Sequence, residues 1–401
     1  MSETIYLIAP SGHPNYGDEL ILLAWLRHLA RVRPDAAVVV DCHTPGQASV
    51  LVAGAHPNVT FVDTVWRICF ATADLPAAEA VAAAAAAVHE PGRLPNLVSG
   101  IELLARAHVV HLIGGGYLNT VWPHHLALPA AAAAGAERAG ARLFATGQGL
   151  APAGDEERRR LLADCAARFD RFDVRDAPSR ALLADLPGCS HTGDDAWLVA
   201  GTGAVYDTES EASRRDWIFG LQTDLMDDFD DGRGADGLAD AAADLITRWG
   251  LRGADIAFVE GIPGTDRRVY DRIAHLVPDA LFVPFVDIWN RGLPVRPGQF
   301  WVTTRFHLHL LAAARGASGL ALTGRRDYYP VKHESLVQAG SHWALADSCA
   351  LPDRPVRAGG FPSDTVLELR RRKRALADEL YPPPAPRPVA RLRGWRERLF
   401  G

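Results

Sequence analysis

The sequence predicts an α/β protein with two domains, each built around a parallel sheet. Short apolar runs rich in β-branched residues alternate with longer helical patterns along the chain, which is typical of βα units. The chain has 401 residues, too many for one ordinary hydrophobic core, so two domains of roughly 150–200 residues each are expected. Its 48% hydrophobic and 22% charged residues are those of a soluble globular protein.

In the first half, the apolar runs that are short and β-branched predict strands at residues 5–9, 37–41, 59–62, 109–113, 142–146 and 172–174. Apolar residues with helical spacing predict helices at residues 19–31, 76–88, 125–138, 156–167 and 177–183. Residues 198–217 are rich in Gly, Thr, Ser and charge without a clear period, so we expect them to link the two domains.

A second alternation follows this linker. It predicts strands at residues 218–223, 255–259, 281–283, 300–303 and 319–322. It predicts helices between them at residues 238–249, 266–276, 304–315 and 331–339. About five strands per half favour two separate sheets over one large sheet with an appendage.

A last helix is expected at residues 363–380, because the PPPAPRP segment at 382–388 cannot continue it. We therefore predict a first domain at residues 1–200 and a second at 201–362. Residues 363–401 would form a C-terminal helix and a basic, proline-rich tail. Ten Lys and Arg against five Asp and Glu from residue 364 onward give this tail a local charge of +5.

Composition argues against several classes of function. A net charge of −6 gives the whole chain no electrostatic reason to bind nucleic acid. The five cysteines are far apart and include no CxxC pair, which favours free thiols in a reducing compartment over disulfides or a zinc site. The first residues lack the features of a signal peptide, and the alanine-rich stretch 77–88 is too short to span a membrane. We expect a cytoplasmic protein.

Candidate ligand loops follow several strands, where unpaired helix amides attract ligands. The first is APSGHPNYGDELI at residues 9–21. Asn15 tolerates a left-handed backbone, and Asp18 and Glu19 fall in the first helical turn. These acids either line a cleft or only cap the helix.

Two glycine-rich loops come next. HLIGGGYLN places Gly114, Gly115 and Gly116 after a buried strand, so that a ligand or another backbone can approach closely. The pattern is not GxGxxG, and no dinucleotide fingerprint is met. ATGQGLAP places the amide of Gln148 at another strand end, where it could bind a polar ligand.

The basic residues that could bind a ligand lie in two segments, DVRDAPS with Arg175 and TTRFHLHLLAAARG with Arg305 and His307. Arg175 either pairs with a neighbouring aspartate or clamps a carboxylate or phosphate through its two-pronged guanidinium. Arg305 and His307 lie where a helix begins, capped by Thr303 or Thr304. Because cations oppose the helix dipole there, we expect them to be tolerated only when an anion is bound.

Other polar residues favour structural readings. His309 lies on the opposite face of the helix from His307 and is expected in the core or on the surface. His124 and His125 are adjacent in sequence and lack the further ligands of a tetrahedral metal site. Asp194 and Asp195 could bind a hard cation, but a capped turn explains them better. We predict no metal site and no cofactor.

Taken in order, these loops resemble those of the polysaccharide pyruvyl transferase family. The motifs that carry the resemblance are NYGDE (15–19), GGG (114–116), GQGLAP (147–152), VRDAPS (174–179), GDDAW (193–197), TRFH (304–307) and YYPVK (328–332). The resemblance implies two facing Rossmann-like domains, as in glycosyltransferases of the B type, with the site in the interdomain cleft. The N-terminal domain would bind the acceptor and the C-terminal domain the donor.

The activity implied is transfer of the pyruvyl group of phosphoenolpyruvate to two hydroxyls of a sugar, giving a pyruvate ketal and phosphate. Under this reading His307 is the acid, because free imidazole titrates near neutral pH, and Arg305 acts beside it. The substrate-binding residues would be Arg175, Lys332, Asn15, Asp18, Glu19, Gly114, Gly115, Gly116 and Gln148.

Two other functions stay open. One is a glycosyltransferase that uses a nucleotide sugar on the same scaffold, since fold does not fix chemistry. The other is a sugar-binding relative without turnover. The basic tail, with Trp395, Leu399 and Phe400 near its end, suggests contact with an anionic membrane that carries a lipid-linked acceptor. Alternatively, the tail packs on the acidic remainder of the chain.

Overall fold

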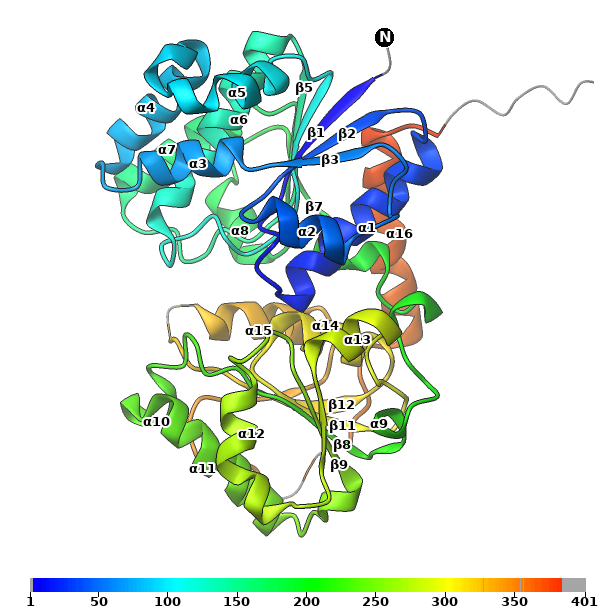
Figure 1. The fold of residues 1–401 in the computed structure, drawn as a ribbon. Coiled ribbons are helices and arrows are strands. Elements are labelled where there is room, and N and C mark those ends of the chain that lie inside the picture. The colour runs from blue at the N-terminus through cyan, green and yellow to red at the C-terminus, as the bar shows by residue number, and fades with distance from the viewer. Residues whose placement is uncertain (1–2, 327, 354, 356, 384–401) are drawn as a thin grey trace, which may run out of the picture.

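The computed structural model describes residues 3–326, 328–353, 355 and 357–383. Two α/β units lie one above the other in Figure 1. The first contains a parallel seven-stranded sheet. Its spatial order is β3 (Val59–Val62), β2 (Ala37–Asp41), β1 (Thr4–Ile8), β4 (Val109–Leu112), β5 (Arg142–Gln148), β6 (Arg171–Val174) and β7 (Cys189–His191).

The second unit contains a parallel six-stranded sheet. Its spatial order is β10 (Leu281–Val283), β9 (Ile256–Val259), β8 (Trp217–Gly220), β11 (Phe300–Thr303), β12 (Ser318–Leu322) and β13 (Ala344–Ala346). Each sheet therefore runs outward in both directions from its first strand, as in a Rossmann fold. The direction of winding reverses between β1 and β4 and again between β8 and β11, and such switch points are where ligands bind.

Helices cover both faces of each sheet (Figure 1). Those of the first unit are α1 (Tyr16–Val32), α2 (Pro45–Leu51), α3 (Thr64–Ala71), α4 (Ala77–His89), α5 (Val98–Leu104), α6 (Ala127–Ala139), α7 (Glu156–Ala166) and α8 (Ala177–Leu182). Those that follow are α9 (Glu211–Arg214), α10 (Phe229–Gly232), α11 (Gly234–Arg248), α12 (Arg267–Ile273), α13 (Phe285–Arg291), α14 (Phe306–Ala314), α15 (Tyr329–Gln338) and α16 (Ser363–Leu380). Two short 3-10 turns, η3 (Pro123–Leu126) and η4 (Asp195–Leu198), border the site described below.

Strand β1 shows how the sequence builds these layers. Its side chains alternate between the two faces of the sheet. Ile5 and Leu7 join the apolar cluster under α1, whereas Tyr6 and Ile8 join the cluster under α3 to α6. All four side chains are fully buried, as expected for a parallel strand covered on both sides.

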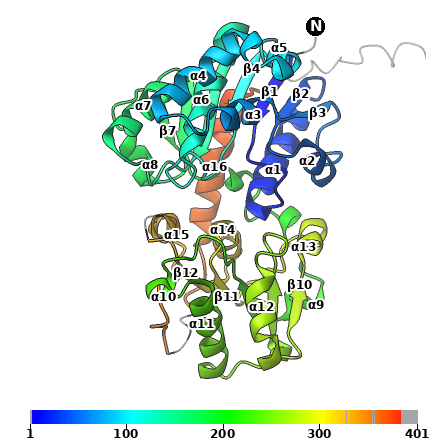
Figure 2. The same ribbon diagram turned by 60° about the vertical axis from the view of Figure 1, so that its left-hand side comes forward.

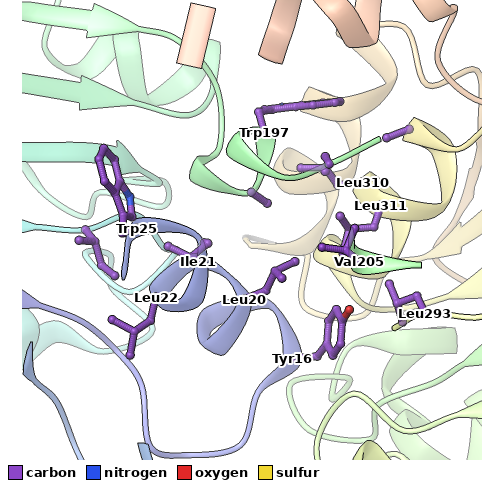
Figure 3. Close-up of a cluster of buried hydrophobic side chains, with 14 of the residues drawn as sticks. Tyr16, Leu20, Ile21, Leu22, Trp25, Trp197, Val205, Leu293, Leu310 and Leu311 are labelled. Atoms are coloured by element: carbon purple, nitrogen blue, oxygen red, sulfur yellow. The ribbon is translucent and has the colours of Figure 1, made fainter. Parts of the chain in front are cut away.

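One apolar cluster continues from the first unit into the second (Figure 3). Tyr16 and Leu20 of α1 face Leu310 and Leu311 of α14, together with Leu293. Backbone contacts cross the same boundary, since the amide of Tyr16 donates to the carbonyl of Gly261 at 2.9 Å. The two helices that begin at the site loops are therefore packed directly against each other.

Helix α16 returns to the first unit and runs along it beside η4 (Figures 1 and 2). Lys373 on this helix is fully buried between Asp173 and Asp195, with its Nζ at 2.8 and 2.9 Å from their carboxylates. Although burial opposes its charge, the two carboxylates raise the pKa of Lys373 to about 12. Tyr381 follows the helix and donates or accepts a hydrogen bond with His111 at 3.0 Å.

Several sequence predictions were wrong at the level of elements. The sheets have seven and six strands where six and five were predicted, because β7 and β13 are three-residue strands with partly exposed side chains. Helices α2, α3, α5 and α13, each of seven or eight residues, were not predicted. The predicted linker at 198–217 does connect the two sheets, and Val205 and Tyr206 within it lie in the core that joins the units.

The cysteines were predicted correctly. All five are free thiols, and three of them are buried. In the part of the chain that the structure describes, no helix is both long enough and apolar enough to cross a membrane.

Candidate active site

A cavity of about 760 Å³ lies between the two units, at both switch points. Loops after β1 and β4 line it from the first unit, and loops after β8 and β11 line it from the second. Its volume is that of a typical small-molecule site and exceeds what one three-carbon phosphate ester needs. Seven of the predicted site residues line it: Asn15, Asp18, Gly116, Arg175, Arg305, His307 and Lys332.

Helix α1 enters the cavity at its N-terminus. Asn15 caps the helix by accepting from the amide of Gly17, and its own amide donates to Asp18 at 2.8 Å. Asp18 faces the basic groups of the cavity. Burial raises the pKa of Asp18, although His307 and Lys332 oppose the shift. Asn15 therefore caps the helix, and Asp18 lines the cavity.

His307 reaches the cavity from the first turn of α14 and points across the boundary between the units. Its Nε2 lies 3.3 Å from Oδ1 of Asp194, which belongs to the first unit. A Cβ at position 17 would lie 1.8 Å from Nδ1 of His307, so only glycine leaves room for the ring. His307 is thus held by the N-terminal unit on two sides.

Asp194 is the residue that ties the basic groups together. It caps η4 by accepting from the amide of Ala196, and it is buried. Its carboxylate also lies 3.7 Å from Arg175. Burial favours the neutral acid, but His307 and Arg175 lower the pKa of Asp194 to about 2. The residue is therefore an anion that orients an imidazole and a guanidinium.

Arg175 follows β6 and precedes α8, as predicted. Its Nε contacts Asp176 at 3.3 Å, and its guanidinium stacks on the ring of Phe306 with a centroid distance of 4.6 Å. Gly116 and Gly149 leave room for the guanidinium, because a Cβ at either position would approach it within 3 Å. Arg175 therefore pairs with aspartates, as one reading predicted, and it lines the cavity, while the clamp on a ligand anion stays a prediction.

Lys332 on α15 completes the basic end of the cavity. Its Nζ lies 3.4 Å from the ring centroid of Tyr328, whose hydroxyl donates to the carbonyl of Gly116 at 2.8 Å. Burial and the nearby Arg175 lower the pKa of Lys332 well below its usual value. A bound anion would offset both influences, which suits this end of the cavity to a negatively charged ligand.

The expectation that an anion alone lets Arg305 and His307 stand at the start of α14 was wrong. Arg305 makes a two-pronged ion pair with buried Asp266, with 2.6 Å between Nε and Oδ2. His307 has Asp194. The protein itself supplies the carboxylates that balance the helix dipole. The expected cap was also wrong, because Arg305 occupies the cap position and Thr303 accepts from its amide instead.

Four predicted site residues do not line the cavity. The side-chain amide of Gln148 donates to the carbonyls of Leu112 and Ile113, so it holds the glycine loop from behind. Gly114 and Gly115 leave room for Asp195 and Tyr117, side chains of the protein itself rather than a ligand. Glu19 is fully buried and accepts from the amide of Gly12.

His309 and Asp195 have structural roles, as predicted. His309 is buried in the core, stacked on Trp343 and bonded to His333 and Ser341. Asp195 accepts from Trp25, Thr146 and Gly114 besides Lys373. Among the residues that the structure describes, no group of three or more His, Cys, Asp or Glu side chains is arranged to hold a metal ion.

Sequence reasoning missed the aromatic part of the cavity. Phe70, Trp122 and the rings of His13, His43, His124 and His125 line the end that belongs to the first unit. They come from the loop after β1, the loop after β2, helix α3 and the segment that includes η3. The signal available in the sequence was WPHHL at residues 122–126, which was considered only as a metal site.

The chain matches the model of one known family. A family model described as polysaccharide pyruvyl transferase matches residues 15–323. The chain belongs to the polysaccharide pyruvyl transferase family. The match includes the loops of Asn15, Arg175 and His307 and ends before Lys332. As a member of this family, the protein is a transferase of polysaccharide biosynthesis. No curated protein sequence matches the chain.

Solved structures agree with the fold that the family resemblance implies. S. aureus MnaA in its UDP co-structure has a TM-score of 0.54 at 14% identity, covering 95% of this chain and 90% of that one. The UDP-GlcNAc 2-epimerase of Neisseria meningitidis, bound to UDP-GlcNAc, has a TM-score of 0.53 at 12% identity, covering 95% of this chain and 99% of that one. The UDP-N-acetylglucosamine 2-epimerase of Rickettsia bellii has a TM-score of 0.52 at 11% identity, covering 95% of this chain and 98% of that one. The transferase therefore has a glycosyltransferase-B-like fold, as predicted.

Proposed function

We propose that this transferase takes its pyruvyl group from phosphoenolpyruvate and joins it to two hydroxyls of one sugar as a ketal, releasing phosphate. The observation that carries the proposal is the convergence of Arg175, Lys332 and His307 at one end of the cavity, around Asp194. Phosphoenolpyruvate has both a carboxylate and a phosphate. Such a ligand needs several cationic donors in fixed positions, together with a proton donor.

In the proposed reaction, Arg175 and Lys332 hold the anionic groups of the donor, and Arg305 flanks them. His307, oriented by Asp194, gives a proton to the methylene carbon, which becomes a methyl group. The adjacent carbon acquires oxocarbenium character, and a sugar hydroxyl attacks it. The carbon–oxygen bond to phosphate then breaks, and the second hydroxyl attacks to close the ketal. One hydroxyl proton restores His307, and the other leaves with phosphate.

Asp18 is placed to assist the sugar hydroxyls. It lies at the N-terminus of α1, opposite His307 and Lys332 in the same cavity. Because burial raises the pKa of Asp18, its carboxylate is a better base than an exposed aspartate would be. The proposal requires no metal ion and no further cofactor.

The test is a ligand comparison followed by product analysis. Phosphoenolpyruvate at a hundredfold excess over its dissociation constant should stabilise the fold by roughly 3 kcal/mol in a thermal-shift measurement. UDP-GlcNAc serves as the second ligand, because the solved Neisseria meningitidis epimerase, which has the same fold, is bound to it. Stabilisation by the nucleotide sugar alone would favour a glycosyltransferase. With glycan acceptors present, mass spectrometry should find the pyruvate ketal, and phosphate should be released.

The proposal extends to where the acceptor is met, at an anionic cytoplasmic membrane surface. The residues of the tail from 384 onward lie outside the described part of the chain. In α16, Arg371 and Arg372 pair with Glu368, so their charge is partly neutralised on the same helix. Lys373 was counted with the membrane-facing charges, and this was wrong, because it is buried.

Deleting residues 384–401 tests the membrane proposal and leaves buried Tyr381 in place. Full-length protein should sediment with anionic phosphatidylserine vesicles at low salt, and the shortened protein should not, since each Lys or Arg near such a surface contributes about 1 kcal/mol. Equal sedimentation of both proteins, or none by either, would exclude this role for the tail.

A further inference from the structure

The end of the cavity away from Lys332 is a continuous wall of rings. His43 lies 5.5 Å from Phe70, and Phe70 lies 5.6 Å from His124, measured between ring centroids. His124 is 4.4 Å from His125, which stacks on Trp122 at 6.0 Å with only 11° between the ring planes. We call these five residues the ring wall. All five belong to the first unit and line the cavity.

Phe70 is the most unusual member of the ring wall. Its side chain is 47% exposed, although it stands at the end of α3 with its neighbour Cys69 fully buried. Leaving an aromatic side chain in water at the mouth of a cavity gains nothing for the fold. Exposed apolar surface inside a concave site is typical of ligand contact.

The imidazoles of the ring wall are uncharged near neutral pH. Burial lowers the pKa of His43 to about 4, with His13 and His124 adding to the effect. Burial likewise lowers the pKa of His125 to about 3 and that of His124 below its usual value. A neutral imidazole offers one hydrogen-bond donor and one acceptor. The wall therefore combines flat apolar faces with neutral hydrogen-bonding edges.

A hexopyranose ring has the complementary chemistry. One face carries axial C–H groups that pack on aromatic rings, and its rim carries hydroxyls that both donate and accept. A negatively charged sugar would find no cation here, because the described side chains that line this end are aromatic rings, imidazoles and prolines. A nucleobase would also stack on these rings.

Tyr328 connects the ring wall to the basic end. Its ring lies 5.9 Å from that of Trp122 and 3.4 Å from Nζ of Lys332. A sugar seated on the wall therefore has one edge directed at the groups that would hold the donor. Resting on the proposed function, we infer that the ring wall is the acceptor subsite and that it takes an uncharged hexopyranose unit of the glycan, stacked on Phe70.

The inference is tested without any donor, by saturation-transfer NMR. The probes are the methyl β-glycosides of galactose, glucose and mannose, with methyl β-D-glucuronide as the charged counterpart. At least one neutral glycoside should receive saturation, strongest on its axial C–H face, and the glucuronide should receive less. Phe70→Ala should weaken the binding of that glycoside roughly threefold to tenfold, the range of one aromatic contact.

Leu276→Ala is the matched control, because Leu276 is 46% exposed and does not line the cavity. It should bind the glycoside like wild type. His124→Ala should reproduce the Phe70→Ala loss from a different loop, which guards against a local defect in α3. Thermal shift with phosphoenolpyruvate on the same variants should give the wild-type value.

The outcomes separate this inference from the proposed function. The ring wall is not the acceptor subsite if no neutral glycoside receives saturation, if the glucuronide binds best, or if both variants bind like wild type. If glycoside binding depends on Phe70 but phosphoenolpyruvate does not stabilise the protein, the ring wall is the acceptor subsite and the proposed donor is wrong. Ketal formation unaffected by Phe70→Ala would keep the donor and reject the subsite.

Discussion

The two ends of the cavity are built in opposite ways. The basic end joins groups from both units, with Asp194 of the first holding His307 of the second, and it depends on a dense set of ion pairs. The ring wall comes from one unit alone and contains no ion pair. An assembly of mutually balanced charges loses several interactions when one member is changed, whereas a wall of rings loses one contact at a time.

The two ends also depend on different parts of the fold. The basic end exists only while α1 and α14 stay packed together, because His307 would otherwise lose both Gly17 and Asp194. The ring wall needs only the first sheet and its loops. Substitutions that act at one end and spare the other therefore test the comparison.

The largest effect is expected for His307→Ala. Loss of the proton donor should lower kcat by roughly 10²–10⁴, while donor affinity and glycoside binding stay near wild type. Steady-state kinetics with phosphoenolpyruvate and titration of the donor measure both quantities. His275→Ala, at an exposed histidine outside the cavity, is the control. A kcat within a few-fold of wild type would show that His307 is not the acid.

Gly17→Ala sharpens the same prediction without removing the imidazole. The new methyl group would overlap Nδ1 of His307, so the ring must move away from Asp194. We expect most of the loss in kcat seen for His307→Ala. Full activity in Gly17→Ala would mean that the position of His307 matters little.

The next effect is expected for Arg175→Lys. Lysine keeps the charge but cannot make the two-pronged contact or the stack on Phe306. Donor affinity should fall roughly 10–100-fold, in line with about 1.5–3 kcal/mol for hydrogen bonds to charged groups. Arg305→Lys should weaken donor binding less, because much of its guanidinium is already engaged by Asp266. Arg160→Lys, at an exposed position, should change nothing.

An unchanged donor affinity in Arg175→Lys would move the anion site toward Lys332. Gly116→Ala provides an independent check, since its methyl group would lie 2.9 Å from the guanidinium of Arg175 and 3.1 Å from Nζ of Lys332. It should reduce donor affinity and leave glycoside binding intact. A loss of both would show that the two ends are not independent.

The sequence could predict the basic end of the cavity better than the ring wall. Arg175, His307 and Lys332 stand in short motifs at strand ends, where topology alone brings residues together. Asp194 was read only as a turn residue, because its partners are 19 and 113 positions away in sequence. The ring wall was missed for a similar reason, since Phe70 and His124 meet only after α3 and η3 have packed.

Glycines illustrate the limit in another way. The GGG segment was correctly marked as a place of close approach, but sequence alone could not tell what approaches. In the structure it is Asp195 and Tyr117 at the first two positions and Arg175 with Lys332 at the third. The partition of the fold into two parallel sheets was predictable from the alternation of strands and helices, whereas short edge strands such as β7 were not.

A smaller effect on the cavity is expected for Lys373→Met. This change leaves Asp173 and Asp195 buried without their cation, which should cost about 3–5 kcal/mol of unfolding free energy. The raised pKa of Lys373, about 12, means that its contribution is present below the ordinary lysine value and is lost only as pH rises through 12. Donor affinity should fall only a few-fold, because Asp195 supports the glycine loop from behind.

Chemical denaturation at pH 7 measures the loss, with Arg374→Met on the exposed side of α16 as the control. If Lys373→Met and Arg374→Met unfold at the same denaturant concentration, the buried ion pairs add nothing to stability. In that case α16 is held to the first unit by its apolar contacts alone.

The smallest effect on the cavity is expected for Glu19→Gln, at a residue that the sequence placed in the substrate site. Glu19 is fully buried, with one oxygen bonded to the amide of Gly12 at 2.7 Å and the other without a hydrogen-bond partner. Burial raises the pKa of Glu19 to about 8. The folded protein therefore binds a proton here that the unfolded chain releases above about pH 4.3.

Stability of the wild type should accordingly fall as pH rises from about 4.5 to 8, and Glu19→Gln, which cannot ionise, should lose this part of the dependence. Glutamine keeps an oxygen for the amide of Gly12, so the loop after β1 should hold its shape. Donor affinity and glycoside binding should stay within a factor of about two. Denaturation midpoints at pH 5 and pH 8 measure the slope, with exposed Glu156→Gln as the control. A large loss of donor affinity would return Glu19 to the substrate site, and parallel pH profiles would show that its carboxyl does not titrate in this range.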